Sequence, residues 1–424
     1  MPRAPRERYP WVVRSRSLSP LVVLPSLCLC TACDWLDGVE VEVEFTMHAE
    51  RFDPSTGEFS PAPPPELARN LFDWIPTADG LLLIGGLDEN GKFTTAVEHY
   101  DPSTQTWTRR APWPDPGLAW SVWVDDRLCT LGGYDELDVA VRPAVWCYSP
   151  SADAWTEGAP LPRDYTSFYP TVHAGEIWIP GGTEIGDATV ASPIDELWSY
   201  DPAADVWTQH ASLPTPRGLA AVHALGDRLY VVGGWDEDSL LDSDDTPEES
   251  EMLVYEPATD TWTLAPQMPS PRGLYGSRVV GGELVVYFGI TSGPLIEIFD
   301  PVANAWRAGA DPIEPIDSGV YSSTLDGDRL YMLVLADGGS GGQSVSSGTL
   351  WSYDVGDDAW AVAGTRDPSR PDALFYGQPY AGSLHWVGAF TEFALIPEDP
   401  KQAANHVPAP RSPAARGVVL GRRD

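Results

Sequence analysis

The chain carries very little positive charge. Only two of its 424 residues are lysine, Lys92 and Lys401, so arginine supplies nearly all of the 26 basic side chains. The 62 Asp and Glu residues leave a formal net charge of −36. So acidic a surface argues against nucleic acid and an anionic membrane surface as partners of the folded part, because both are negatively charged themselves.

The chain also lacks long hydrophobic runs and heptad patterns. No segment is apolar over the ~20 residues that a membrane-spanning helix needs, and no sustained heptad predicts a coiled coil. Glycine (39 residues) and proline (42 residues) are abundant and separate short strand-like runs. This composition is typical of an all-β protein with many turns.

Cysteine is scarce, and three of the five cysteines, Cys28, Cys30 and Cys33, lie close to the N-terminus. They belong to a segment with a basic flank, a short apolar run and small residues before Cys33, which is the layout of a secretory signal. We expect export to remove residues 1–32, leaving residues 33–38 as a tether. Cys129 and Cys147 fall on predicted neighbouring strands, where an oxidising compartment allows a disulfide. Two separate buried thiols are the alternative.

The last residues of this leader, Cys30-Thr31-Ala32-Cys33, resemble the lipobox of bacterial lipoproteins. In that family the thiol after the small residues is lipidated and becomes the new N-terminus. The resemblance implies a protein of the bacterial cell envelope that is anchored to a membrane through a lipid on Cys33. An ordinary secretory cleavage at the same place is the alternative.

One eight-residue pattern recurs along the chain. "YDPSTQTW" begins at Tyr100, and its variants place two aromatic residues seven positions apart seven times in all. Most of these pairs follow an apolar run that ends in two glycines, such as Gly85-Gly86 and Gly233-Gly234. The period of about fifty residues is long enough for four short strands and their turns.

Paired glycines, then Tyr-Asp-Pro, then Trp, resemble the kelch repeat, and the resemblance covers residues 52–389. It implies an all-β, seven-bladed kelch-type β-propeller over residues 39–397, followed by a disordered tail over residues 398–424. The C-terminal strands would form the inner half of the seventh blade and the N-terminal strands its outer half, which leaves no sheet edge unpaired. A competing interpretation places Thr391–Pro397 in the third-strand position of that blade.

Arginine recurs shortly before the first strand of the predicted blades. Five of the seven blades carry it, at Arg69, Arg163, Arg217, Arg272 and Arg370. One interpretation is structural, with each arginine bound to a neighbouring backbone or carboxylate. The other follows from the resemblance: in kelch proteins that grip acidic peptides, arginines of this segment reach the central mouth. There they would hold a carboxylate or phosphate.

No other residues form a recognisable catalytic set. His173 and His223 occupy equivalent places in consecutive repeats, which favours a structural role. The acidic stretch Trp235–Glu251 lacks the residue order of a calcium loop and predicts a solvated loop. The likeness to galactose oxidase, a kelch enzyme with copper, is confined to the blade pattern, and no ligand spacing predicts a metal or other cofactor.

These observations predict a monomeric, non-catalytic binding module displayed at the envelope. Its partner would be a protein or an anionic carbohydrate or peptide, bound at the axial mouth. An enzyme acting on an acidic sugar, as periplasmic kelch sialic-acid mutarotases do, is the alternative. In that case the arginines would hold the carboxylate and an acidic side chain would move protons.

Overall fold

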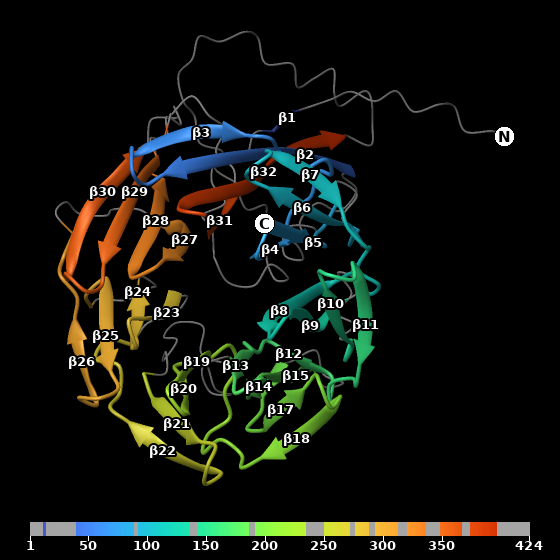
Figure 1. Cartoon of the computed structure of the whole chain (residues 1–424). Coiled ribbons are helices and arrows are strands. Elements are labelled where there is room, and N and C mark those ends of the chain that lie inside the picture. Colours follow the sequence, from blue (N-terminus) through green and yellow to red (C-terminus); the bar gives the residue numbers. More distant parts are fainter. Residues whose placement is uncertain are drawn as a thin grey trace, which may run out of the picture.

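A computed structural model shows seven antiparallel four-stranded blades arranged around one axis (Figure 1). The predicted all-β, seven-bladed propeller is therefore confirmed. Every regular element of the described part is a strand. The structure describes residues 12–13, 40–88, 92–134, 142–185, 191–234, 250–271, 276–287, 293–312, 320–335, 348–366 and 374–396.

Blades 1 to 6 each consist of four strands that follow one another in the chain, with a small extra sheet inserted in blade 3. The strands are given from the innermost outward. Blade 1 contains β4 (Asp73–Pro76), β5 (Leu81–Ile84), β6 (Val97–Asp101) and β7 (Thr106–Arg109), and blade 2 contains β8 (Leu118–Val124), β9 (Arg127–Tyr134), β10 (Val145–Ser149) and β11 (Ala154–Gly158). Blade 3 contains β13 (Thr171–His173), β14 (Glu176–Pro180), β17 (Leu197–Asp201) and β18 (Val206–His210). Blade 4 contains β19 (Ala221–Leu225), β20 (Arg228–Val232), β21 (Met252–Glu256) and β22 (Thr261–Ala265), and blade 5 contains β23 (Gly276–Val280), β24 (Glu283–Tyr287), β25 (Ile296–Asp300) and β26 (Ala305–Ala308). Blade 6 contains β27 (Val320–Asp326), β28 (Arg329–Leu335), β29 (Gly348–Asp354) and β30 (Ala359–Thr365).

Blade 7 joins the two ends of the chain. Its inner strands are β31 (Leu374–Tyr380) and β32 (Ser383–Ile396), and its outer strands are β2 (Glu40–Asp53) and β3 (Glu58–Ala62). Strands β2 and β32 pair along almost their whole length, so the ring closes as the sequence predicts. Residues 391–396 continue β32 instead of forming a separate third strand, and β1 (Val12–Val13) pairs with them.

The hydrophobic core lies between the blades, because each sheet packs its two faces against its neighbours. One cluster joins Cys129, Leu131 and Val145 of blade 2 to Ile177 and Ile179 of blade 3. The innermost strands of neighbouring blades also contact one another, for example β31 with β4 and β13 with β19 (Figure 1). These contacts fix the strands that surround the axis.

In blades 1 to 6 the repeated eight residues form a clasp with the blade that precedes each of them in the ring. In blade 3, Tyr200 donates its hydroxyl to Asp205 Oδ1 at 2.7 Å, and the backbone N–H of Ala159 donates to the same oxygen at 2.6 Å. Trp207 Nε1 donates to the carbonyl of Ala159 at 2.9 Å. Because Ala159 follows the last strand of blade 2, the turn of blade 3 holds that segment at both of its backbone groups.

The same clasp occurs in blades 2, 4 and 6, and its variants show what the aspartate does. The three further clasps hold Ala111, Ala211 and Ala310. In blades 1 and 5 the held residue is Pro63 or Pro266, and proline has no N–H to donate. The turns of these two blades carry Gln105 and Asn304 in place of aspartate. Among these six blades, the turn therefore carries aspartate where the facing residue of the preceding blade has a backbone N–H to donate.

We expect Asp153→Ala, in the clasp of blade 2, to lower the free energy of unfolding by about 1–3 kcal/mol. The hydroxyl of the buried Tyr148 and the backbone N–H of Ala111 both lose a charged acceptor in this variant. Asn304→Ala is the matched control and should cost less than about 1 kcal/mol, since Pro266 offers no N–H. Denaturant unfolding followed by tryptophan fluorescence measures both. Equal costs for the two variants would contradict this role of the aspartate.

Cys129 and Cys147 lie directly opposite each other on β9 and β10 and form a disulfide. Their separation of 18 residues closes a short loop, for which the chain-entropy model gives a stabilisation of about 3 kcal/mol. Mass spectrometry of unreduced, alkylated protein should find neither thiol modified. Replacing both with alanine should lower the denaturation midpoint, whereas two alkylated thiols in the native protein would refute the bond.

Candidate functional site

The two faces of the ring differ in how much they vary from blade to blade. On one face, four residues connect the third and fourth strands in all seven blades. On the other, the connection between the second and third strands varies in blades 1 to 6, from the short segment 288–295 of blade 5 to the long segment 233–251 of blade 4. We call these the turn face and the connection face. Binding residues on a repeated scaffold usually lie in its variable loops, so the connection face is the candidate site.

In blade 3 the connection face carries an additional sheet. Strand β12 (Tyr165–Thr166) precedes the innermost strand of the blade and pairs with β15 (Thr183–Ile185), which pairs with β16 (Ala191–Pro193). The side chain of Tyr169, which follows β12, is 42% exposed. This connection therefore presents an accessible aromatic residue beside the innermost strands.

Two of the predicted arginines are buried in ion pairs within their own blades. Arg69 is fully buried and its Nη1 lies 2.6 Å from Glu98 Oε2 of β6. Arg217 is 3% exposed and its Nη2 lies 2.6 Å from Glu251 Oε2, immediately before β21. Both pairs fasten the segment that enters the blade to the third strand of that blade. This geometry supports the structural interpretation at these two positions.

A third predicted arginine, Arg163, is accessible. Its side chain is 43% exposed, and its Nη1 lies 3.3 Å from Glu196 Oε1 and 3.5 Å from Glu184 Oε2. Arg272 and Arg370 lie outside the described residues. Of the predicted arginines that the structure describes, Arg163 alone has a partly exposed side chain, and it lies on the connection face.

We call an ion pair that joins the segment entering a blade to the third strand of that blade a strut. The structure shows two further struts that the sequence did not predict. In blade 7 the buried Arg366 donates its Nε to Glu50 Oε2 at 2.8 Å. In blade 2 the charges are reversed, because Asp115 precedes the first strand and contacts Arg142, which precedes the third. The sequence does contain a feature that could have predicted the acidic partner of a strut. Glu50 and Glu98 each lie two positions before the aromatic residue of the third strand.

A small pocket opens beside the innermost strands of blades 1 and 2, at the connection-face end. Its cavity volume is about 20 Å³, which admits a water-sized group, and it is lined by Leu71, Asp73, Ile84, Trp113, Gly117, Ala119, Ser121 and Thr130. Ser121 of β8 donates its hydroxyl to Asp73 Oδ2 of β4. Burial raises the pKa of Asp73 to about 6, and the hydrogen bond from Ser121 limits that rise.

His223, on the innermost strand of blade 4, has a structural role. His223 of β19 contacts Ser277 Oγ of β23 through Nε2 at 2.8 Å, which joins blades 4 and 5. Burial and, to a smaller extent, the nearby charge of Arg278 lower the pKa of His223 to about 3. A neutral imidazole with a fixed partner agrees with the structural role that the sequence suggests for this position.

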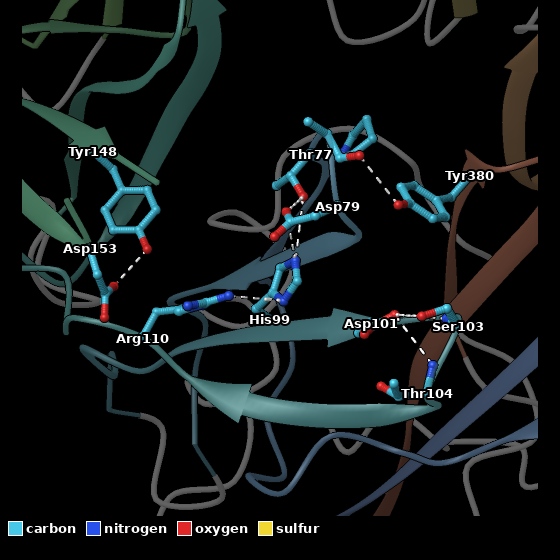
Figure 2. Close-up of polar contacts among 12 residues, drawn as sticks. Thr77, Asp79, His99, Asp101, Ser103, Thr104, Arg110, Tyr148, Asp153 and Tyr380 are labelled. Carbon is cyan, nitrogen blue, oxygen red and sulfur yellow. Dashed lines mark hydrogen bonds and ion pairs between the residues drawn. The ribbon is translucent and has the colours of Figure 1, made fainter. Parts of the chain in front are cut away.

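On the turn face, His99 is the centre of a polar cluster. Figure 2 shows Thr77 and Asp79 on one side of its ring and Arg110 on the other. Its Nε2 lies 3.2 Å from Asp79 Oδ1, and Arg110 Nη2 lies 3.3 Å from Nδ1. Because arginine can only donate, we assign the ring proton to Nε2. Burial lowers the pKa of His99. Because both ring nitrogens have polar partners within blade 1, we interpret the cluster as a structural element that stabilises this blade.

Among the described residues, no three His, Cys, Asp or Glu side chains are placed to hold a metal ion together. The same part of the chain contains no helix that is long and apolar enough to cross a membrane. The predicted acidic loop lies mostly outside it, since residues 235–249 are not described.

Comparison with known proteins identifies similar chains. The family model KLHDC2/KLHL20/DRC7 Kelch-repeats domain matches residues 77–289, half of the chain. Kelch-like protein terF of Aspergillus terreus is 27% identical over 250 residues, which is 56% of this chain and 53% of that protein. Kelch-like protein 36 of Mus musculus is 25% identical over 255 residues, 58% of this chain and 40% of that protein. The chain thus spans about half or less of the length of these relatives.

Among solved structures, the chain is similar to YjhT, and the matched part is 71% of this chain and 99% of the YjhT chain. The two have 16% sequence identity and a TM-score of 0.48.

Proposed function

The chain belongs to the kelch-repeat family, and from that premise we propose that it is a non-catalytic scaffold that binds a protein partner with its connection face. The observation that supports this is the contrast between the faces. On the turn face all seven turns have the same length, and in blades 1 to 6 the clasps account for it. The connections on the other face vary in length among blades 1 to 6. Function on a shared fold resides in such variable segments.

Two exposed apolar residues allow a matched test of this proposal. Tyr169 is on the connection face, and Val302, 94% exposed, is in a turn of the opposite face. Partners that co-purify with the full chain from its native host should be lost from Tyr169→Glu and retained by Val302→Glu, with both variants folded by circular dichroism. The reverse pattern would place the binding surface on the turn face.

We further propose that an acidic group of the partner, in a peptide or a carbohydrate, engages Arg163. Its partly exposed side chain supports this, because arginine binds carboxylates through paired, charge-assisted hydrogen bonds. Arg163→Ala should then weaken the binding of the co-purified partner about tenfold or more, since such a bond contributes about 1.5–3 kcal/mol. Unchanged affinity and unchanged salt dependence would remove Arg163 from the site.

We also propose that the chain is exported and held at the bacterial envelope by a lipid on Cys33. The leader in the sequence supports export, and so does the disulfide, because such bonds persist in oxidising compartments. Cys33 lies outside the described residues. Produced in a bacterial host, the protein should partition into detergent, and Cys33→Ala should release it into the aqueous phase. Equal partitioning of the two forms would exclude the anchor.

A further inference from the structure

We propose that the pocket between blades 1 and 2 binds a primary ammonium group, which a lysine side chain of the partner would supply. The inference rests on the proposed function only for the source of the ammonium. Its physical basis is the pocket itself, which is small, opens on the connection face and contains the carboxylate of Asp73.

Asp73 differs from the buried acidic side chains of the struts. Glu98 and Glu50 are each paired with a buried arginine. Among the described residues the only hydrogen-bonding partner of the Asp73 carboxylate is the neutral hydroxyl of Ser121, and no positive charge acts on it. A carboxylate that lies in a pocket without a cation can be stabilised by a cation that enters from outside.

The other polar groups of the pocket match an ammonium group. An –NH₃⁺ group has three donors and no acceptor. The pocket offers three acceptors: the Asp73 carboxylate, the Ser121 hydroxyl and the Thr130 hydroxyl, which donates its own proton to the carbonyl of Trp146. Trp113 also lines the pocket, and its Nε1–H is a neutral donor that has no hydrogen-bonding partner among the described residues. An anion would find a carboxylate here and no charged donor.

The charge of the whole chain also favours the binding of a cation. The net charge of −36 attracts cations to the chain. Asp73 is the only titratable side chain in the pocket lining. Asp115, two residues before Gly117 of the lining, is already paired with Arg142. The protonation state of Asp73 therefore decides whether the pocket is negative.

This gives the inference a characteristic pH dependence. The pKa of Asp73 in the free protein is about 6, so the carboxyl is almost fully ionised at pH 7.5 and about nine-tenths protonated at pH 5.0. An ammonium ligand requires the ionised form. Its dissociation constant should therefore rise about tenfold between pH 7.5 and pH 5.0, although the ammonium group itself keeps its charge throughout.

The test uses the full chain and n-butylammonium, which has the length and charge of a lysine side chain. Ligand-detected NMR titrations at pH 7.5 and pH 5.0 compare the wild type with Asp73→Asn, which keeps the size of the side chain and can still accept from Ser121. Asp126→Asn is the matched control, because it changes the net charge equally and its side chain is 87% exposed. Neutral n-butanol shows whether the apolar chain binds without the charge.

We expect at least tenfold weaker binding by Asp73→Asn at pH 7.5, no change in Asp126→Asn and no binding of n-butanol. The wild type should show the tenfold loss at pH 5.0, which tests the inference without any variant. Equal losses in the two variants, or affinity that does not depend on pH, would overturn it. Failure of Tyr169→Glu to release the partner would refute the proposed function and leave butylammonium binding intact, so the two outcomes are distinguishable.

Discussion

Replacing Arg69 with methionine is expected to lower the free energy of unfolding by about 3–5 kcal/mol, because it leaves a buried carboxylate without its cation. Glu98 is almost fully buried, and Arg69 Nη1 lies 2.6 Å from its Oε2. A backbone N–H, that of Glu66, also donates to Glu98 at 3.0 Å, but one neutral hydrogen bond does not offset the loss of a full charge.

Two comparisons separate this effect from a general loss of packing. The double variant Arg69→Met with Glu98→Leu should recover most of the lost stability, because replacing both members of a buried pair by apolar residues is often nearly neutral. Arg163→Met should cost less than about 1 kcal/mol, because its ion pairs are exposed to solvent. Chemical denaturation measures all three. Equal costs for Arg69→Met and Arg163→Met would contradict the strut.

Acidification from pH 7 to pH 4.5 is expected to destabilise the protein through its buried histidines. Burial lowers the pKa of His223 to about 3 and that of His385 to about 4, compared with 6.5 in the unfolded chain. Well above pH 6.5 neither state binds these protons. As the pH falls below 6.5 the unfolded chain takes them up first, so stability is lost, by about 2–3 kcal/mol for each histidine at pH 4.5.

Asp73 acts in the opposite direction. Its pKa is raised in the folded state to about 6, so its ionised form costs stability above pH 6, and that cost disappears as the pH falls toward 3.8. The relief at pH 4.5 is about 2 kcal/mol, which leaves a net loss of about 3 kcal/mol from the three groups. Differential scanning calorimetry between pH 7 and pH 4.5 measures this loss.

Two variants determine which groups produce the acid sensitivity. His223→Gln should flatten the dependence of the melting temperature on pH, because glutamine can still bond to Ser277 and does not titrate. Asp73→Asn should make the dependence steeper, because it removes the opposing group. A wild-type melting temperature that is constant or rises on acidification would contradict the assigned pKa values.

The arrangement of the blades could be read from the sequence because it depends on local patterns. The aromatic pairs and glycine pairs repeat with a nearly constant period, and an incomplete set of strands at each end requires a shared seventh blade. The pairing of Glu40–Phe52 with Leu384–Ile396 follows from that requirement.

The partners of the arginines could not be predicted in the same way. Arg69 and Glu98 are 29 residues apart, and their contact depends on the register between the first segment and the third strand of the blade. In blade 7 the strut is Arg366, four residues before the predicted Arg370, because the segment that enters this blade has a different length. The spacing identified the segment but not the bonded residue.

The pocket left no sequence signal at all. Asp73 is one of 62 acidic residues, and its partner Ser121 belongs to the next blade, 48 residues away. Neither the burial that raises its pKa nor the absence of a cation beside it among the described residues is a local property. Such a site becomes visible only when two neighbouring blades are placed side by side.

Site-specific photo-crosslinking in living cells tests most directly whether the connection face is the binding surface. A benzoylphenylalanine residue would replace Tyr169 in one form of the full chain and Val302 in another; both positions are exposed, and they lie on opposite faces. We expect irradiation to yield a discrete crosslinked species from position 169 and none from position 302. A crosslinked species from position 302 alone would contradict the account.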